Sequence, residues 1–216
     1  MAAQAVIFDL DGTILNTLPS LAESLNAVLL EHQLPTLKLE SVKAIIGDGI
    51  LKLIERALPP SKRQEGLAIS LKADFKTQYS LRQFNQCSPY KGIINLLSAL
   101  KARGLKLAVL SNKDQENVSV LIDRFFPKTF SLALGASPAR PPKPSPEGAL
   151  EIISSFKVNS SHVCYLGDGE TDMLLASRLG FKALGAAWGY RAKENLIKNG
   201  AQAILEAPKE LLNFLD

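Results

Sequence analysis

The sequence predicts an α/β fold, in which a parallel sheet carries helices on both faces and a helical segment is inserted after the first strand. Two observations predict it. Short apolar runs alternate with longer amphipathic segments along most of the chain, which is the pattern of a parallel sheet with helical crossovers. The stretch from residue 18 to residue 84 breaks this alternation, because it contains helical patterns and no convincing strand.

Five short apolar runs are predicted as the strands of the sheet. The first, Ala5 to Phe8, is bounded by the turn residues Asp9 to Gly12, which is typical of a buried strand. The other four runs have a similar length and character, and they are Leu105 to Leu110, Ser131 to Leu134, His162 to Leu166 and Phe181 to Gly185.

Helical patterns separate the later strands. Gly104 and Gly180 follow two of these patterns directly, as expected for residues that end a helix. The predicted core helices are Ile93 to Ala102, Gln115 to Arg124, Ser145 to Phe156 and Thr171 to Leu179.

The inserted segment is predicted to form a second, helical domain. Pro19, Pro35, the Gly47-Asp48-Gly49 turn and Pro59-Pro60 divide it into separate helices. These helices are Leu18 to His32, Leu39 to Ile46, Ile50 to Leu58 and Lys62 to Tyr79. We therefore expect a catalytic core from residues 1–16 and 85–216, and a helical cap from residues 17–84.

Composition excludes several classes of protein. Of the 216 residues 46% are hydrophobic, and the net charge of +4 comes from scattered lysines and arginines, so we expect no nucleic-acid partner. Cys87 and Cys164 lie far apart, which argues against a zinc site or a disulfide framework. No apolar stretch approaches the ~18 residues of a membrane span, and the N-terminus is unlike a secretory signal. We expect a cytoplasmic protein with no membrane partner, and both a monomer and a homodimer stay open.

Acidic residues follow two of the predicted strands. Asp9 and Asp11 come after the first strand, and Asp168 and Asp172 after the fourth. Ligand sites of parallel sheets gather at the carboxyl ends of the strands, so we expect these acids to converge. Carboxylates that lie so close repel one another unless a cation intervenes, and oxygen ligands suit Mg²⁺. The sequence therefore predicts a magnesium site.

The same strand ends offer groups for phosphoryl transfer. A carboxylate can attack phosphorus and form an aspartyl phosphate, while a second carboxylate serves as general acid and base. Ser111, after the second strand, and Lys143, held between two prolines, would stabilise the negative charge of the transferring group.

Each pattern also has an ordinary structural explanation. Asp9 to Gly12 can be a tight turn, and Ser111-Asn112 can end a strand and cap a helix. Lys143 can be a solvated surface residue, and Asp172 a helix charge favoured by the dipole. Their order and their common placement at strand ends favour a site.

Together these residues resemble the haloacid-dehalogenase superfamily, whose core is a Rossmann-like sheet. Its four motifs match Asp9-Leu10-Asp11-Gly12-Thr13, Ser111-Asn112, Lys143 and Gly167-Asp168 with Asp172. Further features are similar to the phosphoglycolate-phosphatase branch, and they are Ile46-Gly47-Asp48-Gly49, Pro89-Tyr90-Lys91-Gly92, Lys143-Pro144-Ser145-Pro146 and Trp188-Gly189. The resemblance covers essentially the whole chain.

The resemblance implies a role for each motif residue. Asp9 would be the nucleophile and a metal ligand, and Asp11 the general acid and base, which binds the metal through its backbone carbonyl. Asp168 would be a further ligand, and Asp172 would support the outer coordination shell. The substrate phosphate would be bound by Thr13, Ser111, Asn112 and Lys143.

Two positions depart from the commonest pattern of the family. Asn16 stands where many relatives carry Asp, and Gly169 where Ser or Thr often follows the fourth-motif Asp. Neither change removes a group that the mechanism requires.

The cap is expected to exclude water from the site and to contribute to specificity. Gly47 and Gly49 are either donors to a substrate carboxylate or simple turn residues. Lys43, Lys52 and Arg56 are either partners of an anionic substrate or solvated helix charges.

The resemblance implies a Mg²⁺-dependent phosphatase that acts on a small phosphorylated metabolite, with 2-phosphoglycolate as the first expectation. A phosphoglucomutase-like transfer, a pyrophosphatase or nucleotidase specificity, and a non-catalytic binding relative are the alternatives.

Overall fold

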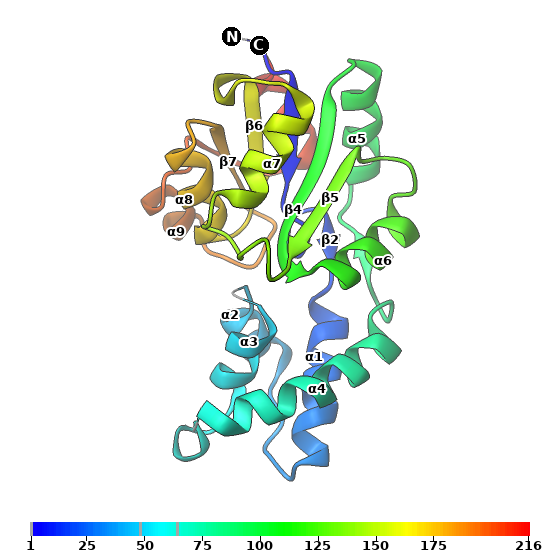
Figure 1. The fold of residues 1–216 in the computed structure, drawn as a ribbon, viewed down its shortest axis with the longest axis vertical. Coiled ribbons are helices and arrows are strands. Elements are labelled where there is room, and N and C mark those ends of the chain that lie inside the picture. The colour runs from blue at the N-terminus through cyan, green and yellow to red at the C-terminus, as the bar shows by residue number, and fades with distance from the viewer. Residues whose placement is uncertain (1, 48, 64) are drawn as a thin grey trace. The chain divides into compact units, whose positions relative to one another are not determined.

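The computed structural model describes residues 2–47, 49–63 and 65–216. Asp48, in the predicted cap turn, and Gln64, in the fourth predicted cap helix, lie outside the described residues. The chain forms two compact units, of which the first joins the N-terminal residues up to Leu15 with Pro89–Asp216 and the second is Asn16–Ser88. Each unit is built around its own set of elements (Figure 1).

The first unit contains a six-stranded sheet in the order β5-β4-β1-β6-β7-β8 (Figure 1). Every neighbouring pair is parallel, which confirms the predicted fold class. The central strand β1 pairs with β4 on one side, with Phe8 opposite Val109, and with β6 on the other, with Phe8 opposite Leu166. The strands are β1 (Ala5–Phe8), β4 (Lys106–Asp114), β5 (Leu132–Ala136), β6 (Val163–Gly167), β7 (Lys182–Ala186) and β8 (Ala203–Leu205).

Helices cover both faces of this sheet. The helices are α5 (Ile93–Ala102), α6 (Gln115–Phe125), α7 (Glu147–Phe156), α8 (Glu170–Arg178) and α9 (Lys193–Lys198), with 3-10 helices η2 (Ser160–His162) and η3 (Pro208–Phe214). Val6 and Phe8 of β1 pack in one core cluster with α5, α6 and η3. Ala5 and Ile7 pack in the other with α7, α8 and α9.

This two-sided burial explains why the strands read as continuous apolar runs. Successive side chains of a strand point to opposite faces, so a sheet with helices on both faces needs apolar residues at every position. All four side chains of β1 are accordingly inaccessible to solvent.

The sequence did not predict β8, α9 or η3. Each is short, and a run of three to seven residues is too brief to establish a helical or strand period. Strand β4 is also longer than the predicted run, because it continues past Leu110 through Ser111, Asn112 and Lys113.

The second unit is helical, with α1 (Leu18–Glu31), α2 (Leu39–Ile45), α3 (Ile50–Ala57), the 3-10 helix η1 (Pro60–Lys62) and α4 (Glu65–Arg82). Helix α4 packs against α1 and α3, and the stacked rings of Phe75 and Tyr79, 5.8 Å apart at their centroids, are buried. The connecting strands β2 (Leu15–Asn16) and β3 (Ser88–Pro89) pair with each other. Within the described part of the chain, every helix is too short or too polar to span a membrane.

Candidate active site

The carboxyl ends of β4, β1 and β6 bring three distant chain segments together, because these strands are neighbours in the sheet. Asp9 directly follows β1, and its backbone N–H donates to the carbonyl of Leu166 in β6 at 2.9 Å. Asp168 directly follows β6. Ser111 and Asn112 occupy the last part of β4. The strand order therefore explains why these polar residues meet at one edge.

Three buried acids form the centre of the site. One carboxylate oxygen from each of Asp9, Asp168 and Asp172 lies within 4.8 Å of the others. Burial raises the pKa of Asp9 well above its ordinary value; the Lys143 ammonium opposes this rise, and Asp172 and Asp168 add to it. Burial, reinforced by Asp172, raises the pKa of Asp168 to about 7. So much negative charge in a small volume provides hard oxygen ligands for a divalent cation.

Lys143 lies inside this acidic cluster. Its side-chain amine donates to Asp9 Oδ1 at 2.7 Å, to Asp172 Oδ1 at 2.6 Å and to the Leu110 carbonyl at 2.9 Å. Burial lowers the pKa of Lys143, but the carboxylates of Asp172 and Asp9 outweigh that effect and raise it above its ordinary value. Lys143 is therefore a buried cation and not the solvated surface residue that its sequence position alone also allowed.

Asn112 holds the loop that carries Lys143. The Lys143 backbone N–H donates to Asn112 Oδ1 at 2.6 Å, and Asn112 Nδ2 donates to the Lys143 carbonyl at 3.2 Å. The Asn112 amide thus pairs with both backbone groups of one residue and ties the loop before α7 to the end of β4.

Asp172 is held by donors from three sides. Besides Lys143, the Tyr165 hydroxyl donates to Asp172 Oδ1 at 2.9 Å and the Gly169 N–H to Oδ2 at 2.9 Å. Sequence reasoning did not identify Tyr165, which lies within an apolar run. Its signal was the hydroxyl itself, since a buried tyrosine hydroxyl requires a hydrogen-bond partner. Burial first, and then Asp172, raises the pKa of Tyr165 well above its ordinary value.

Asp168 is held by Thr13 and by the segment after β7. The Thr13 hydroxyl donates to Asp168 Oδ1 at 2.8 Å, and the Tyr190 N–H to Oδ2 at 2.7 Å. Trp188 Nε1 donates to the Thr13 carbonyl at 2.9 Å. Thr13 is fully buried and its hydroxyl faces Asp168, while the phosphate-binding role that the resemblance implies for it stays a prediction.

Among the described residues, Asp11 is not one of the three acids that cluster within 4.8 Å. Its carboxylate oxygen Oδ2 is 2.9 Å from the Lys113 ammonium, and 19% of the Asp11 side chain is exposed. Lys113 directly follows Ser111 and Asn112 in the sequence, and the sequence analysis assigned it no role. Ser111 is buried, and its hydroxyl accepts a hydrogen bond from the Lys113 backbone N–H at 3.2 Å.

The candidate specificity residues of the cap belong to the second unit, and their roles stay predictions. Lys52 donates to Glu55 at 2.7 Å, and Arg56 donates to the Ile45 carbonyl at 3.0 Å. Lys43 lies in α2, and Gly47 and Gly49 have positive φ angles of 132° and 87°.

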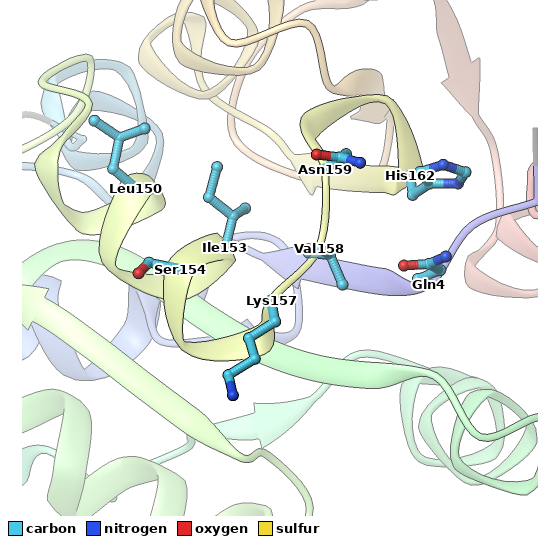
Figure 2. Close-up of a pocket in the computed structure, with 8 residues that line it drawn as sticks. All are labelled: Gln4, Leu150, Ile153, Ser154, Lys157, Val158, Asn159 and His162. Carbon is cyan, nitrogen blue, oxygen red and sulfur yellow. The ribbon is translucent and has the colours of Figure 1, made fainter.

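A separate hollow of about 550 Å³ lies near the amino ends of β1 and β6, beside Gln4 and His162 (Figure 2). Its lining includes none of the predicted site residues. Figure 2 shows Lys157 extending away from Asn159 and His162, so these polar groups do not converge on one point.

The chain is similar to phosphatases over almost its whole length. It is 32% identical to a phosphoglycolate phosphatase of Mannheimia succiniciproducens over 215 residues, covering 96% of each chain. It is 29% identical to that of Aquifex aeolicus, covering 99% of this chain and 97% of the relative. A crystal structure of a candidate phosphoglycolate phosphatase from Lactobacillus delbrueckii subsp. bulgaricus superposes with a TM-score of 0.93 at 28% identity, covering 100% and 99% of the two chains.

The family model described as haloacid dehalogenase-like hydrolase matches residues 6–186. This match confirms the resemblance that the four motifs indicated. With the motif acids at one sheet edge and relatives aligned from end to end, the chain belongs to the haloacid dehalogenase-like hydrolase family.

Proposed function

We propose that this protein is a phosphatase that hydrolyses a small phosphate monoester with the help of Mg²⁺, and that Asp9 is its nucleophile. The observation that carries the proposal is the contact between the buried Asp9 carboxylate and the Lys143 ammonium at 2.7 Å, beside two further acids. A carboxylate that lies against a cation can receive a phosphoryl group whose charge the same cation stabilises.

The donor set fits Mg²⁺. The three carboxylates are close enough to share one ion, and the Lys143 ammonium alone does not neutralise their negative charge. Asp9 and Asp168 would hold the ion together with the Asp11 carbonyl, while Asp172, which already accepts three hydrogen bonds, would support them. The bound ion would neutralise charge on the transferring phosphoryl group.

In the first half of the reaction a carboxylate oxygen of Asp9 bonds to phosphorus as the bond from phosphorus to the leaving oxygen breaks. The Asp11 carboxyl donates its proton to that leaving oxygen. In the second half a water oxygen bonds to the same phosphorus and Asp11 accepts a proton from the water. The bond between phosphorus and Asp9 then breaks, which releases inorganic phosphate and restores the Asp9 carboxylate.

Lys143 and Ser111 would bind the substrate phosphate, with the Asn112 backbone nearby. The Asn112 side chain would act indirectly, since it holds the backbone of Lys143. We also propose that Thr13 supports Asp168, because the Thr13 hydroxyl donates a hydrogen bond to that carboxylate. Its role in binding the substrate phosphate stays a prediction.

The first substrate that we propose is 2-phosphoglycolate, because the relatives aligned along the whole chain carry the name phosphoglycolate phosphatase. A panel of phosphorylated metabolites tests this choice. Faster hydrolysis of a nucleotide or pyrophosphate, or transfer of phosphate between positions of a hexose, would replace 2-phosphoglycolate while leaving the phosphoryl chemistry intact.

The chemistry is tested with p-nitrophenyl phosphate, with and without Mg²⁺. Asp9→Asn should abolish phosphate release, and a chelator should do the same for the wild type. Asp123→Asn, the same change at an exposed position of α6, serves as the control and should retain full activity. Activity that persists in Asp9→Asn, or that needs no divalent cation, would contradict the proposal.

A further inference from the structure

Lys113 is a buried lysine that the four family motifs do not include. Only 8% of the residue is exposed, and lysines are almost never buried unless they are paired. Its ammonium lies 2.9 Å from Asp11 Oδ2. The Lys113 side chain is only 6% exposed, so water screens its ion pair with Asp11 far less than it screens a surface pair.

The backbone fixes the position of Lys113. The register between β4 and β5 shifts between Leu110 and Asp114, and such irregularities redirect side chains. The Lys113 N–H donates to the Ser111 hydroxyl at 3.2 Å. A Cβ on Gly135 of β5 would lie 2.6 Å from the Lys113 carbonyl, so β5 approaches Lys113 more closely than a side chain allows. The backbone at the end of β4 therefore fixes the direction in which the Lys113 side chain leaves the strand.

The two lysines of the site serve different acids. Lys143 donates to Asp9 and Asp172, which lie in the three-acid cluster. Lys113 pairs with Asp11, whose carboxylate is not part of that cluster among the described residues. The acid that would exchange protons thus has a cation distinct from the one that faces the nucleophile.

We propose that Lys113 is a positioning residue that holds the Asp11 carboxylate ready for the second half of the reaction. This proposal rests on the proposed function. By contacting Oδ2 of Asp11, Lys113 fixes the orientation of the carboxylate that accepts the proton of the attacking water. As the water oxygen bonds to phosphorus, the bond to Asp9 breaks and its electron pair returns to the Asp9 carboxylate. Lys113 neither gains nor loses a proton.

The test is Lys113→Met with p-nitrophenyl phosphate and Mg²⁺. Nitrophenolate is a good leaving group, so the first half of the reaction should proceed while release of phosphate from Asp9 slows. We expect kcat and KM to fall together by about tenfold or more, with kcat/KM retained within about threefold. A burst of nitrophenolate equal to the enzyme concentration should precede steady turnover.

Matched variants separate positioning from folding. Lys106→Met makes the same change at the other end of β4 and should show wild-type kinetics with no burst. Lys113→Gln removes the charge but keeps a neutral donor on a side chain one atom shorter, so it replaces Lys113→Met if circular dichroism shows that the latter is unfolded. In an Asp11→Asn background, Lys113→Met should change kcat no further, because Lys113 acts through Asp11.

Three results would overturn the proposal: unchanged kcat in a folded Lys113 variant, a raised KM with no burst, or a loss that adds to that of Asp11→Asn. None of these three results contradicts the proposed function as long as activity still requires Mg²⁺ and the Asp9 carboxylate. Loss of those two requirements is a failure of the proposed function itself.

Discussion

Gly12 and Gly189 are the residues on which the position of Asp168 depends. A Cβ on Gly12 would lie 2.4 Å from Asp168 Oδ2, and one on Gly189 would lie 2.2 Å from the Asp168 Cβ. Gly12 also has a φ of 86°, a conformation that side chains with a Cβ adopt at a cost. The Asp168 carboxylate therefore fits only because two loops approach it without side chains.

Gly12→Ala should destabilise the protein and lower phosphatase activity at least tenfold, since a shift of about 1 Å in a catalytic group is enough for that loss. Gly180→Ala is the matched control: its φ is 70°, and nothing lies within 4 Å of its added Cβ. Both variants should lose about 1–2 kcal/mol to the left-handed backbone, but only Gly12→Ala should lose activity. Urea unfolding measures the stability of both variants, and steady-state assays measure their activity. Equal activities of the two variants would contradict this account.

At the residue scale, the side chains that belong to the family motifs were predictable from the sequence, but the residues that contact them were not. The sequence indicated that Asp9, Asp168 and Lys143 gather, because each follows a strand or lies in a loop at the same edge. Lys113, Tyr165 and the Tyr190 N–H were missed, because their roles come from a register shift, a buried hydroxyl and a loop after β7. None of these leaves a periodic signal in the sequence.

Strand β4 is the element on which sequence reasoning and structure differ most. The prediction ended it at Leu110, since polar residues normally end a buried apolar run. The strand continues to Asp114 because its polar end is buried in the site, where Asn112 and Lys143 pair with each other. Hydrophobicity alone predicts a loop for such a polar segment. Polar residues that are buried at the end of a strand indicate a functional site.

The link between β4 and the loop of Lys143 depends on one amide. Asn112→Ala removes both hydrogen bonds to the Lys143 backbone and leaves a buried N–H without its 2.6 Å acceptor. We expect a loss of about 1–3 kcal/mol of unfolding free energy and a fall in kcat/KM, because Lys143 is then less well placed. Urea unfolding and steady-state kinetics measure the two effects.

Asn159→Ala is the control for this change, because Asn159 is exposed and lies before η2, away from the site. It should alter stability by no more than about 0.5 kcal/mol. The same small effect in Asn112→Ala would show that the loop needs no such tie.

At the scale of the whole molecule, the order of the strands in the sheet determines where the centre of the site lies. The segments around residues 9, 112, 143 and 168 are far apart in the chain, and they meet because β4 and β6 flank β1. The alternation of strands and helices predicted a parallel sheet and a common edge. It did not predict the order of the strands or the edge strand β8, because those depend on packing between distant segments.

The central claim is that Asp9 accepts the phosphoryl group, and mass spectrometry of an acid-quenched Asp11→Asn variant tests it most directly. Without the Asp11 base, p-nitrophenyl phosphate and Mg²⁺ should leave the enzyme phosphorylated, since nitrophenolate departs without a general acid. The account predicts one added phosphoryl group on the peptide that contains Asp9, and none when Asp9 is also changed to Asn. A phosphoryl group on another peptide, or turnover by the wild type with no phosphorylated Asp11→Asn enzyme, would contradict it.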